Sequence, residues 1–512
     1  MKNEPKLPAG FVSGMSELLG GEAEAFFKSL HSPPFRGLRA NRLKIEPEKL
    51  RALLPFPLEP VRWCAEGFTF PPEERPGKSW AYRAGLFYIQ EPSAMCPAAV
   101  LSARQGERVL DLCAAPGGKS AQLAGQLNGS GLLVSNDASA SRSRALVKNL
   151  EMAGVANGVV LSEQPYRLAE RFAGFFDAVL VDAPCSGEGM FRRDPDAVKG
   201  WADNKPEACA RTQKEILRHA ARMVRPGGRL VYSTCTFEPE ENEKIIASFL
   251  DAHADFYPLP INHERLGVER AGCTPPAAVM EGTPPAAVMA GTPPAAVMEG
   301  TPPAAVILSE AKNLPAGSTD AARIWPHKQK GEGHFISLLG RRGESGGAGK
   351  AAAFRAAKHS EADIKPFLEF CDAFLQTGAL ARFPAFISRH ERSLFLIPEG
   401  LPDLRGLRVA RSGLLLGDIS AGTGKKSKRE TGNFTPSHAL AMALNKNDAR
   451  YSAELSPDGI ARYLKGETLT TEDFDIPPKA WVLTCAYGYP LGWVRWVDGR
   501  LKNHLPKGWA VS

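Results

Sequence analysis

Several patterns that mark common protein classes are missing from this chain of 512 residues. Its nine cysteines include no C-x-x-C pair and no Cys/His cluster with zinc spacing, which excludes a disulfide scaffold and a zinc ribbon. No run reaches the roughly 18 consecutive apolar residues of a membrane span. The first residues carry an acid and two prolines where a secretory signal needs an apolar core. We therefore expect a reduced, cytoplasmic protein with no membrane partner.

The composition excludes wholesale disorder and leaves the partner open. Apolar residues make up 43% of the chain and charged residues 23%, as in ordinary globular proteins. Lys and Arg number 63 against 56 Asp and Glu, and the resulting net charge of +7 is too small to establish a polyanionic partner. At roughly 150 residues per domain, the length predicts about three domains.

One segment differs from the rest of the chain, because residues 274–306 repeat the unit T-P-P-A-A-V-M-(E/A)-G with a period of nine. Two prolines in each unit exclude a continuous helix or a central strand. We predict a disordered or polyproline-like insertion, with a partner-binding motif as the alternative. The glycine-rich residues 340–350 predict a linker, and residues 420–432 a further flexible stretch.

Short apolar strands alternate with longer helical patterns between residues 108 and 339. Strands are expected at 108–112, 131–136, 176–182, 228–234 and 333–339, and helices at 118–127, 141–153, 206–223 and 238–250. This alternation predicts βαβ units and a parallel, doubly wound α/β sheet. Ligands of such sheets bind at the carboxyl ends of the strands, where the unusual residues of this sequence are expected.

The segment from Asp111 to Ser120 follows an expected strand and begins an expected helix. Its small residues and paired glycines let a ligand approach the backbone, and the helix start offers free N–H groups. The G-x-G-x-x-G spacing of a dinucleotide fold and the G-x-x-x-x-G-K of a phosphate loop are both absent, which disfavours a dinucleotide oxidoreductase. Asp137 ends the next strand, where an acid can bind both ribose hydroxyls. The set suits S-adenosylmethionine, a nucleoside without phosphates, and an ordinary tight turn is the alternative for the loop alone.

Two cysteines lie in the loops that follow two further strands. Cys185 belongs to Asp182-Ala-Pro-Cys-Ser-Gly and Cys235 to Ser233-Thr-Cys-Thr. Because both loops are at carboxyl ends of strands, we expect both thiols to face one crevice, where a thiol with a lowered pKa can act as a nucleophile. The alternative for each cysteine taken singly is a small buried apolar residue.

Three sequence blocks, in this order and spacing, resemble the Sun (NSUN-type) family of RNA 5-methylcytosine methyltransferases: Cys113-Ala-Ala-Pro-Gly-Gly-Lys, Asp182-Ala-Pro-Cys-Ser-Gly and Ser233-Thr-Cys-Thr. Further similarity to this family lies in residues 37–44, 88–95, 323–328 and 331–336. The C-terminal part is similar to the RsmF-like subgroup, which acts on bacterial 16S ribosomal RNA, in residues 407–417, 434–441, 488–493 and 499–509.

The resemblance implies an α/β fold with a Rossmann-like, S-adenosylmethionine-dependent methyltransferase core, a small N-terminal α+β domain and a C-terminal PUA-like β-barrel domain. The expected domains are an N-terminal RNA-binding or accessory domain, a catalytic domain that contains the repeat insertion, a connecting domain and a PUA-like RNA-binding domain, over residues 1–86, 87–340, 355–435 and 436–512. The implied cofactor is S-adenosylmethionine, with no metal. The implied partner is 16S ribosomal RNA, and we expect a monomer.

The resemblance also implies roles for site residues. Cytosine C5 is a poor nucleophile until something adds to C6, and Cys235 matches the thiol that the family uses for this addition. Cys185 then assists release of the product. Asp182 can hydrogen-bond the base at N3, which makes C6 more electrophilic, and it lies in the neighbourhood of the cofactor. The implied cofactor-binding residues are Asp137, Asp182 and the loop residues Cys113, Ala114, Ala115, Pro116, Gly117, Gly118 and Lys119.

Three features keep alternatives open. Lys119 could lower a thiol pKa or meet the RNA backbone, or it could be a surface lysine at a helix start. Gln164 stands where the family often has an acid for the adenine amino group. The C-terminal end interleaves aromatic with basic residues, which predicts either RNA stacking and phosphate contacts or a small barrel with core tryptophans. The aromatic residues concerned are Tyr487, Tyr489, Trp493, Trp496 and Trp509.

The leading hypothesis is an RNA cytosine-C5 methyltransferase that modifies 16S ribosomal RNA. A transfer-RNA methyltransferase and a non-catalytic RNA-binding ribosome assembly factor are the alternatives.

Overall fold

The computed structural model of the protein describes residues 6–203, 206–266, 269–273, 319–344, 354, 360–420, 433–470 and 476–510. The repeats at 274–306 lie outside these ranges, as do residues 345–350 and 421–432 of the two predicted flexible stretches. Both stretches were predicted to begin too early. Gly340 belongs to strand β13 (His334–Arg341), and Ser420 ends strand β17 (Leu414–Ser420), because each residue pairs with a neighbouring strand.

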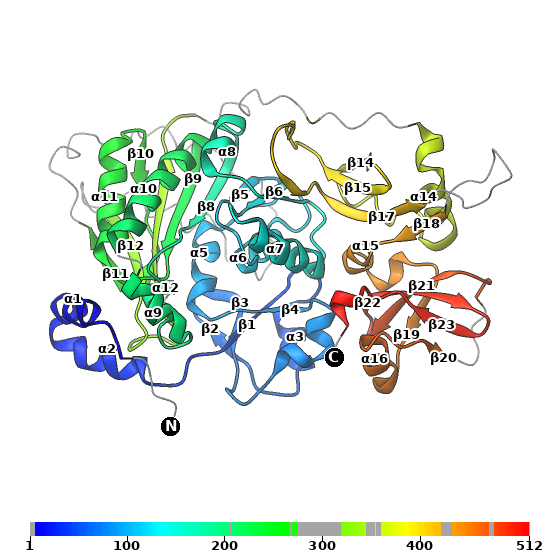
Figure 1. The fold of residues 1–512 in the computed structure, drawn as a ribbon, viewed down its shortest axis with the longest axis horizontal. Helices are drawn as coiled ribbons and strands as arrows, with labels where there is room; N and C mark the ends of the chain where they lie inside the picture. The colour runs from blue at the N-terminus through cyan, green and yellow to red at the C-terminus, as the bar shows by residue number, and fades with distance from the viewer. Residues whose placement is uncertain are drawn as a thin grey trace.

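A ten-stranded mixed sheet forms the centre of the molecule (Figure 1). Its middle is parallel, in the order β7 (Gly158–Leu161), β6 (Leu132–Asn136), β5 (Arg108–Asp111), β8 (Phe176–Asp182) and β9 (Val224–Thr234). Antiparallel strands extend it beyond β9, namely β13, β12 (Thr319–Ile324), β11 (Glu269–Cys273) and β10 (Phe256–Pro258). The strand order reverses between β5 and β8, so the ligand crevice of a doubly wound sheet is expected there.

Helices cover both faces of the parallel strands, which explains why those strands read as continuous apolar runs. One face packs against α5 (Cys96–Leu101), α6 (Gly118–Leu127) and α7 (Ala140–Ala153). The other packs against α8 (Pro165–Arg171), α10 (Pro206–Met223) and α11 (Glu243–Ala252). The predicted doubly wound α/β core is confirmed.

The boundaries of α6, β8 and α10 match the predicted ones. The helix predicted at 238–250 begins later, because a short 3-10 turn at Pro239–Glu241 precedes α11. Five strands of this sheet were not predicted, namely β7, β10, β11, β12 and β16. β7 has only four residues, and β16 (Val409–Arg411) reaches its partner β7 from about 250 residues further along the chain.

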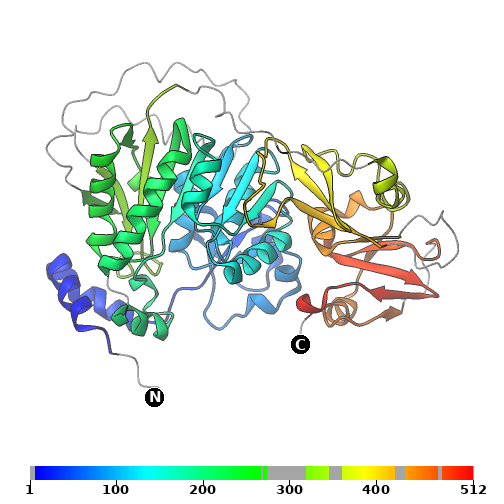
Figure 2. The same ribbon diagram turned by 45° about the horizontal axis from the view of Figure 1, so that its top comes forward.

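The N-terminal part contains two separate structures. Helices α1 (Ala9–Leu19) and α2 (Ala23–Leu30) lie at one end of the molecule, beside α9 (Pro195–Asp203), in both views (Figures 1 and 2). They pack on aromatic residues of the loops that follow β8 and β9, with Phe11 4.9 Å from Phe191 and Phe26 5.2 Å from Phe237 between ring centroids. A four-stranded sheet follows, in the order β2 (Glu59–Val61), β3 (Cys64–Thr69), β1 (Gly37–Ala40), β4 (Phe87–Ile89), with α3 (Pro47–Leu53) and α4 (Trp80–Arg83).

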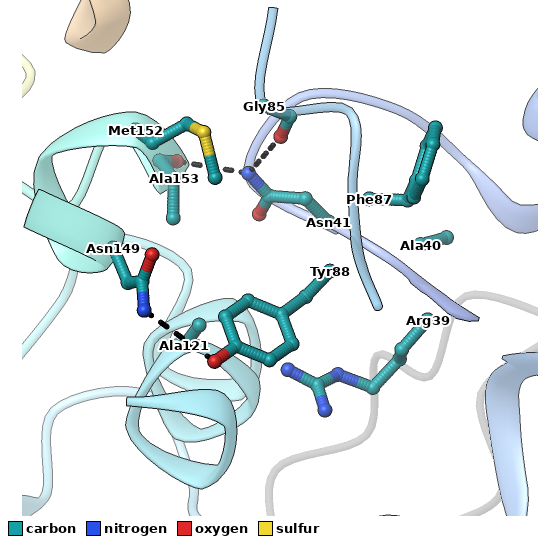
Figure 3. Close-up of a pocket in the computed structure, with 10 residues that line it drawn as sticks. All are labelled: Arg39, Ala40, Asn41, Gly85, Phe87, Tyr88, Ala121, Asn149, Met152 and Ala153. Carbon is teal, nitrogen blue, oxygen red and sulfur yellow. Dashed lines mark hydrogen bonds between the residues drawn. The ribbon is translucent and has the colours of Figure 1, made fainter. Parts of the chain in front are cut away.

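This four-stranded sheet meets helices α6 and α7 of the central sheet at a polar interface (Figure 3). Arg39 of β1, which is 2% exposed, donates a hydrogen bond to the Gly118 carbonyl at 2.6 Å and another to the Gln90 side chain. Asn41 donates to the carbonyls of Gly85 and Ala153, each at 2.8 Å. A cavity of about 20 Å³ remains between β1, β4, α6 and α7, enough for one water molecule.

The C-terminal part consists of two further sheets. The first has the order β14 (Ala385–His390), β15 (Ser393–Pro398), β17, β18 (Asn433–Pro436) and packs against α14 (Glu361–Phe374). The second has the order β19 (Ser452–Glu454), β21 (Trp481–Ala486), β22 (Tyr489–Val497), β23 (Arg500–Asn503), β20 (Leu469–Thr470), with α15 (His438–Ala443) and α16 (Pro457–Leu464) nearby. One apolar cluster joins this second sheet to the N-terminal four-stranded sheet.

Candidate functional site

The loop Cys113–Lys119 connects β5 to α6 at the carboxyl end of the sheet. Gly117 has φ +112°, a conformation that disfavours side chains, and a Cβ there would lie 3.0 Å from Leu146. Asp137, 4% exposed, follows β6 and accepts a hydrogen bond from the Ala115 N–H at 3.3 Å. The predicted loop and the predicted acid therefore meet at the ends of neighbouring strands.

Two residues that the sequence did not single out tie this edge of the sheet together. Asn136 donates to the carbonyl of Leu112 at 3.1 Å and to that of Glu163 at 3.0 Å. Glu163 is fully buried, and its carboxylate accepts from the Arg408 N–H at 2.8 Å. Gln164, by contrast, is exposed where α8 begins. The buried acid at this strand end is thus the neighbour of the predicted position, and a segment from residue 408 onward covers it.

Lys119 and Asp182 form an ion pair at the point where the strand order reverses, with Lys119 Nζ 2.7 Å from Asp182 Oδ2. Lys119 is 9% exposed, so the interpretation as a surface lysine is wrong. Burial disfavours both charges, but the net effect of the contact raises the pKa of Lys119 and holds the pKa of Asp182 well below its usual range. Ser233 Oγ donates to Asp182 Oδ1 at 2.8 Å. The pair is therefore charged at neutral pH.

His334 is a further member of this group that the sequence did not reveal. It begins β13, is 2% exposed, and its Nε2 lies 3.3 Å from Asp182 Oδ1. Its only sequence signal is its place inside a block similar to the methyltransferase family. A pattern of this kind does not show that the strand carrying His334 lies beside β9.

The two cysteines face each other across the crevice, with Sγ atoms 3.3 Å apart. Both are partly exposed, so neither is a core residue. The hydrogen bond to Cys235, together with burial, raises the pKa of the Cys185 thiol well above its ordinary value. The raised pKa keeps Cys185 protonated, so its S–H group can donate toward the Cys235 sulfur. Burial, together with the nearby carboxylates of Asp111, Asp182 and Asp137, raises the pKa of the Cys113 thiol.

This arrangement places one sulfur next to a hydrogen-bond donor and near a lysine cation, both of which stabilise a thiolate. The fixed ion pair adds a donor and an acceptor for a polar heterocycle. Within the described residues, no group of three or more His, Cys, Asp or Glu is arranged to hold a metal ion. None of the helices in those ranges is long and apolar enough to cross a membrane.

The C-terminal aromatic residues are divided between the core and the surface. Trp493 is 2% exposed and packs in the core against Phe370, and Trp509 lies over His438 with ring centroids 4.5 Å apart. Tyr487 is 59% exposed, yet its ring stacks on Trp80 of the N-terminal part at 4.9 Å. Of the five residues, only Trp493 is a core tryptophan, whereas Tyr489, Trp496 and Trp509 are partly exposed. Base stacking on the exposed rings stays a prediction.

Four family models match consecutive parts of the chain. Residues 7–92 match the N-terminal domain of 16S rRNA methyltransferase RsmF, 98–287 match 16S rRNA methyltransferase RsmB/F, 369–444 the RsmF first C-terminal domain, and 450–511 the RsmF PUA domain. The C-terminal PUA fold and the N-terminal α+β domain predicted from the sequence are thereby confirmed. The second C-terminal sheet, with its core tryptophan, is the PUA domain.

One curated relative is similar along nearly the whole chain, and another is more similar along about half of it. A ribosomal RNA small subunit methyltransferase F from Erwinia tasmaniensis is 29% identical over 515 residues, which cover 98% of this chain and 96% of the relative. Another, from Enterobacter sp. (strain 638), is 40% identical over 255 residues, which cover 48% and 53%. Among solved structures, NSun6 from Pyrococcus horikoshii shares the fold, with a TM-score of 0.50 and 21% identity over 66% of this chain and 99% of that one.

The family of the chain follows from the matching models and from the length of the similarity. The cysteines at the strand ends agree with it. The chain belongs to the RsmB/F family of 16S rRNA methyltransferases and has the N-terminal, first C-terminal and PUA domains of its RsmF members.

Proposed function

We propose that this protein methylates C5 of a cytosine in 16S ribosomal RNA through a covalent bond between Cys235 and C6 of the base. The observation that carries the proposal is the pair of facing thiols of Cys185 and Cys235, 3.3 Å apart beside the Lys119–Asp182 ion pair. The ribosomal RNA substrate follows from the family of the chain and from the activity for which its relatives are named.

Cys235 is the better nucleophile of the two thiols. Cys185 stays protonated, and its S–H group can form a hydrogen bond to the sulfur of Cys235. Lys119 supplies a nearby positive charge. Thiolate attack on C6 places electron density on C5, which makes C5 nucleophilic. Bound S-adenosylmethionine would supply the methyl group that C5 accepts.

The Lys119–Asp182 pair would orient the base. Asp182 is held ionised, so its oxygens only accept, and they suit the exocyclic amino group of cytosine. Lys119 is a donor and suits N3, which has a lone pair. A donor at N3 draws electrons from the ring and favours attack at C6. This assignment refines the sequence-based role of Asp182, because an ionised carboxylate cannot itself give a proton to N3.

Cys185 would assist release. After methyl transfer, the proton on C5 leaves to a base or to water, its bonding electrons form the C5–C6 double bond, and the Cys235 sulfur departs with the C6–S electrons. The departing sulfur becomes a thiolate, and Cys185, protonated 3.3 Å away, donates a hydrogen bond to it. Without that donor the adduct would persist.

The residues present fit S-adenosylmethionine. The buried Asp137 carboxylate, which meets N–H groups of Ala115 and Ser139, can also accept from ribose hydroxyls. Gly117 lets the loop before α6 pack closely on Leu146 of α7. The first N–H groups of α6 have no intrahelical acceptors and are available to a ligand. We assign the cofactor to Asp137, Asp182 and the loop Cys113–Lys119. Calorimetry with S-adenosylmethionine should show binding that Asp137→Ala weakens.

The substrate is tested by bisulfite sequencing of ribosomal and transfer RNA from a wild-type strain and from a strain that lacks the gene. A 16S cytosine that loses its methyl group only in the deletion strain supports the proposal. Loss confined to transfer RNA would replace the substrate, and no loss in any RNA would favour the assembly-factor alternative. A copy of the gene carrying Cys235→Ala, returned to the deletion strain, should fail to restore the methyl group.

A further inference from the structure

Two buried glutamates connect the loops that carry the two cysteines. We call residues 183–190 the Cys185 loop and residues 235–242 the Cys235 loop. Glu188 of the Cys185 loop accepts a hydrogen bond at Oε2 from the Phe237 N–H of the Cys235 loop, at 2.7 Å. Glu241 of the Cys235 loop accepts at Oε2 from the Ser186 N–H of the Cys185 loop, at 3.0 Å. Each loop thus provides a carboxylate for the backbone of the other.

Burial of either carboxylate carries a large desolvation free energy. Glu188 and Glu241 are 0% exposed, and in the described part of the chain neither has a Lys or Arg within ion-pair distance. Burial raises the pKa of Glu188 to about 7 and also raises that of Glu241. A buried amide or hydroxyl could cap the same N–H groups at lower desolvation cost, but an ionised acceptor makes the stronger and shorter hydrogen bond.

Each glutamate is also held from outside the two loops. Trp201 Nε1 donates to Glu188 Oε1 at 3.0 Å. Gln213 of α10 donates to Glu241 Oε2 at 2.7 Å and to the Pro184 carbonyl at 3.0 Å. The carboxylates therefore have fixed orientations, so each one fixes the backbone that it binds.

Besides the facing thiols, two other contacts join the loops without involving either glutamate. Ser186 Oγ and Thr236 Oγ1 lie 2.7 Å apart, and the Gly189 N–H donates to the Cys235 carbonyl at 2.8 Å. These contacts would keep the loops together after loss of one carboxylate. The glutamates are thus placed to adjust the thiols and are not the sole link between the loops.

We propose that Glu188 and Glu241 are positioning residues that act crosswise, each holding the cysteine of the opposite loop. Glu188 binds the backbone two residues after Cys235, and Glu241 binds the residue next to Cys185. Because the two thiols serve different steps, the two glutamates serve different steps as well. Glu188 supports formation of the covalent adduct, and Glu241 supports its release. This inference rests on the proposed function of the two cysteines.

The test uses the full-length protein with S-adenosylmethionine and small ribosomal subunits from a strain that lacks the gene. Two quantities are measured for each variant, the rate of methyl transfer and the amount of denaturant-resistant protein–RNA adduct. A displacement of about 1 Å at a reacting group costs on the order of 100-fold in rate. Glu188→Ala and Glu241→Ala should therefore each slow steady-state methylation by about this factor, the first through formation of the adduct and the second through its release. Only Glu241→Ala should accumulate the adduct, and Glu188→Ala should form it slowly.

Conservative variants and a matched control separate positioning from simple stability. Glu188→Gln and Glu241→Gln keep an acceptor oxygen and should recover most of the rate. Glu107→Ala removes a glutamate that pairs with Arg229 at 2.7 Å, at the opposite end of the strands, and should change neither quantity. Should an alanine variant fail to fold, Trp201→Phe and Gln213→Leu loosen the two carboxylates more gently and should show the same asymmetry.

Accumulation of the adduct in both alanine variants, in neither, or only in Glu188→Ala would overturn the crosswise assignment. The same experiment includes Cys235→Ala, which separates this inference from the function on which it rests. Methyl transfer by Cys235→Ala contradicts the proposed mechanism itself. An inactive Cys235→Ala together with symmetric glutamate variants contradicts only the crosswise role of Glu188 and Glu241.

Discussion

The catalytic crevice and the PUA region use their distinctive residues in opposite ways. In the crevice, polar side chains at strand ends turn toward one another, as in the Lys119–Asp182 pair and the facing cysteines. In the PUA region, aromatic rings turn away from solvent, as Trp493 does, or pack on another domain, as Tyr487 does. The comparison teaches that a side chain's position along the fold, and not its chemical type alone, decides whether it is available to a ligand.

The largest expected effect distinguishes two lysines. Lys119→Met removes the cation near Cys235 and leaves the Asp182 carboxylate without its counter-ion, so methyl transfer should fall on the order of 1,000-fold. Lys148→Met removes an exposed lysine that lies over Trp509, and should change the rate less than about threefold. Methylation assays on the two variants make the comparison, and an equal loss in both would contradict the division between the two regions.

A second prediction concerns the aromatic residues of the PUA region. Trp493→Ala should lower the free energy of unfolding by about 3–5 kcal/mol, because it leaves a cavity in the core beside Phe370. Tyr487→Ala removes a half-exposed ring and should cost about 1 kcal/mol. Denaturant unfolding measures both values. A stable Trp493→Ala protein with weak RNA binding would restore the stacking interpretation.

The two regions should also respond to pH with opposite signs. Burial raises the pKa of Asp111, 0% exposed at the end of β5, to about 7, so the folded state binds the proton more tightly than the unfolded state does. The stability contributed by this group is full below pH 4 and falls by about 4 kcal/mol as pH rises to 7. Asp111→Asn should remove that slope in denaturant titrations at several pH values, and an unchanged slope would contradict the assignment.

His438, which begins α15 beside the PUA region, makes stability depend on pH with the opposite sign. Burial lowers its pKa to about 3, so the unfolded state binds the proton more tightly. Its contribution to stability is present above pH 6.5 and is lost as pH falls toward 3. The variant His438→Phe should therefore gain stability relative to the wild type as pH is lowered through this range.

The smallest effect on methyl transfer is expected from removal of the long segment that connects β11 to β12. Cys273 of β11 lies opposite Thr319 of β12, so the ends of the segment 274–318 are already adjacent. Replacement of this segment by an Asn-Gly turn should change methyl transfer less than about twofold, because the length of a connection between paired strands has little effect on stability. A large loss of activity would assign a function to the repeats.

The sequence predicted the crevice well for a physical reason. The loops that contain Cys113, Cys185 and Cys235 each follow a buried parallel strand, and parallel strands end at a common edge. The short apolar runs therefore located the strands, and the common edge at which these strands end brings the three loops together. Neither β16 nor His334 could be found in this way, because each depends on a pairing partner far away in the chain.

The PUA region was harder to predict because alternation of aromatic and basic residues does not specify which neighbour covers a ring. The apolar cluster that joins β22 to β1 and α4 connects segments about 400 residues apart. Lys119 illustrates the same limit on a smaller scale. Its place at the start of a helix suggested exposure, and only the neighbouring Asp182 strand buries it.

The central claim is that Cys235 forms the covalent bond to the base and that Cys185 assists release of the product from this adduct. The direct measurement is the denaturant-resistant protein–RNA complex formed by Cys185→Ala, Cys235→Ala and the double variant in the presence of S-adenosylmethionine and 16S ribosomal RNA. We predict that the complex accumulates in Cys185→Ala and is absent from the other two. Accumulation in Cys235→Ala, or substantial methyl transfer by that variant, would contradict the account.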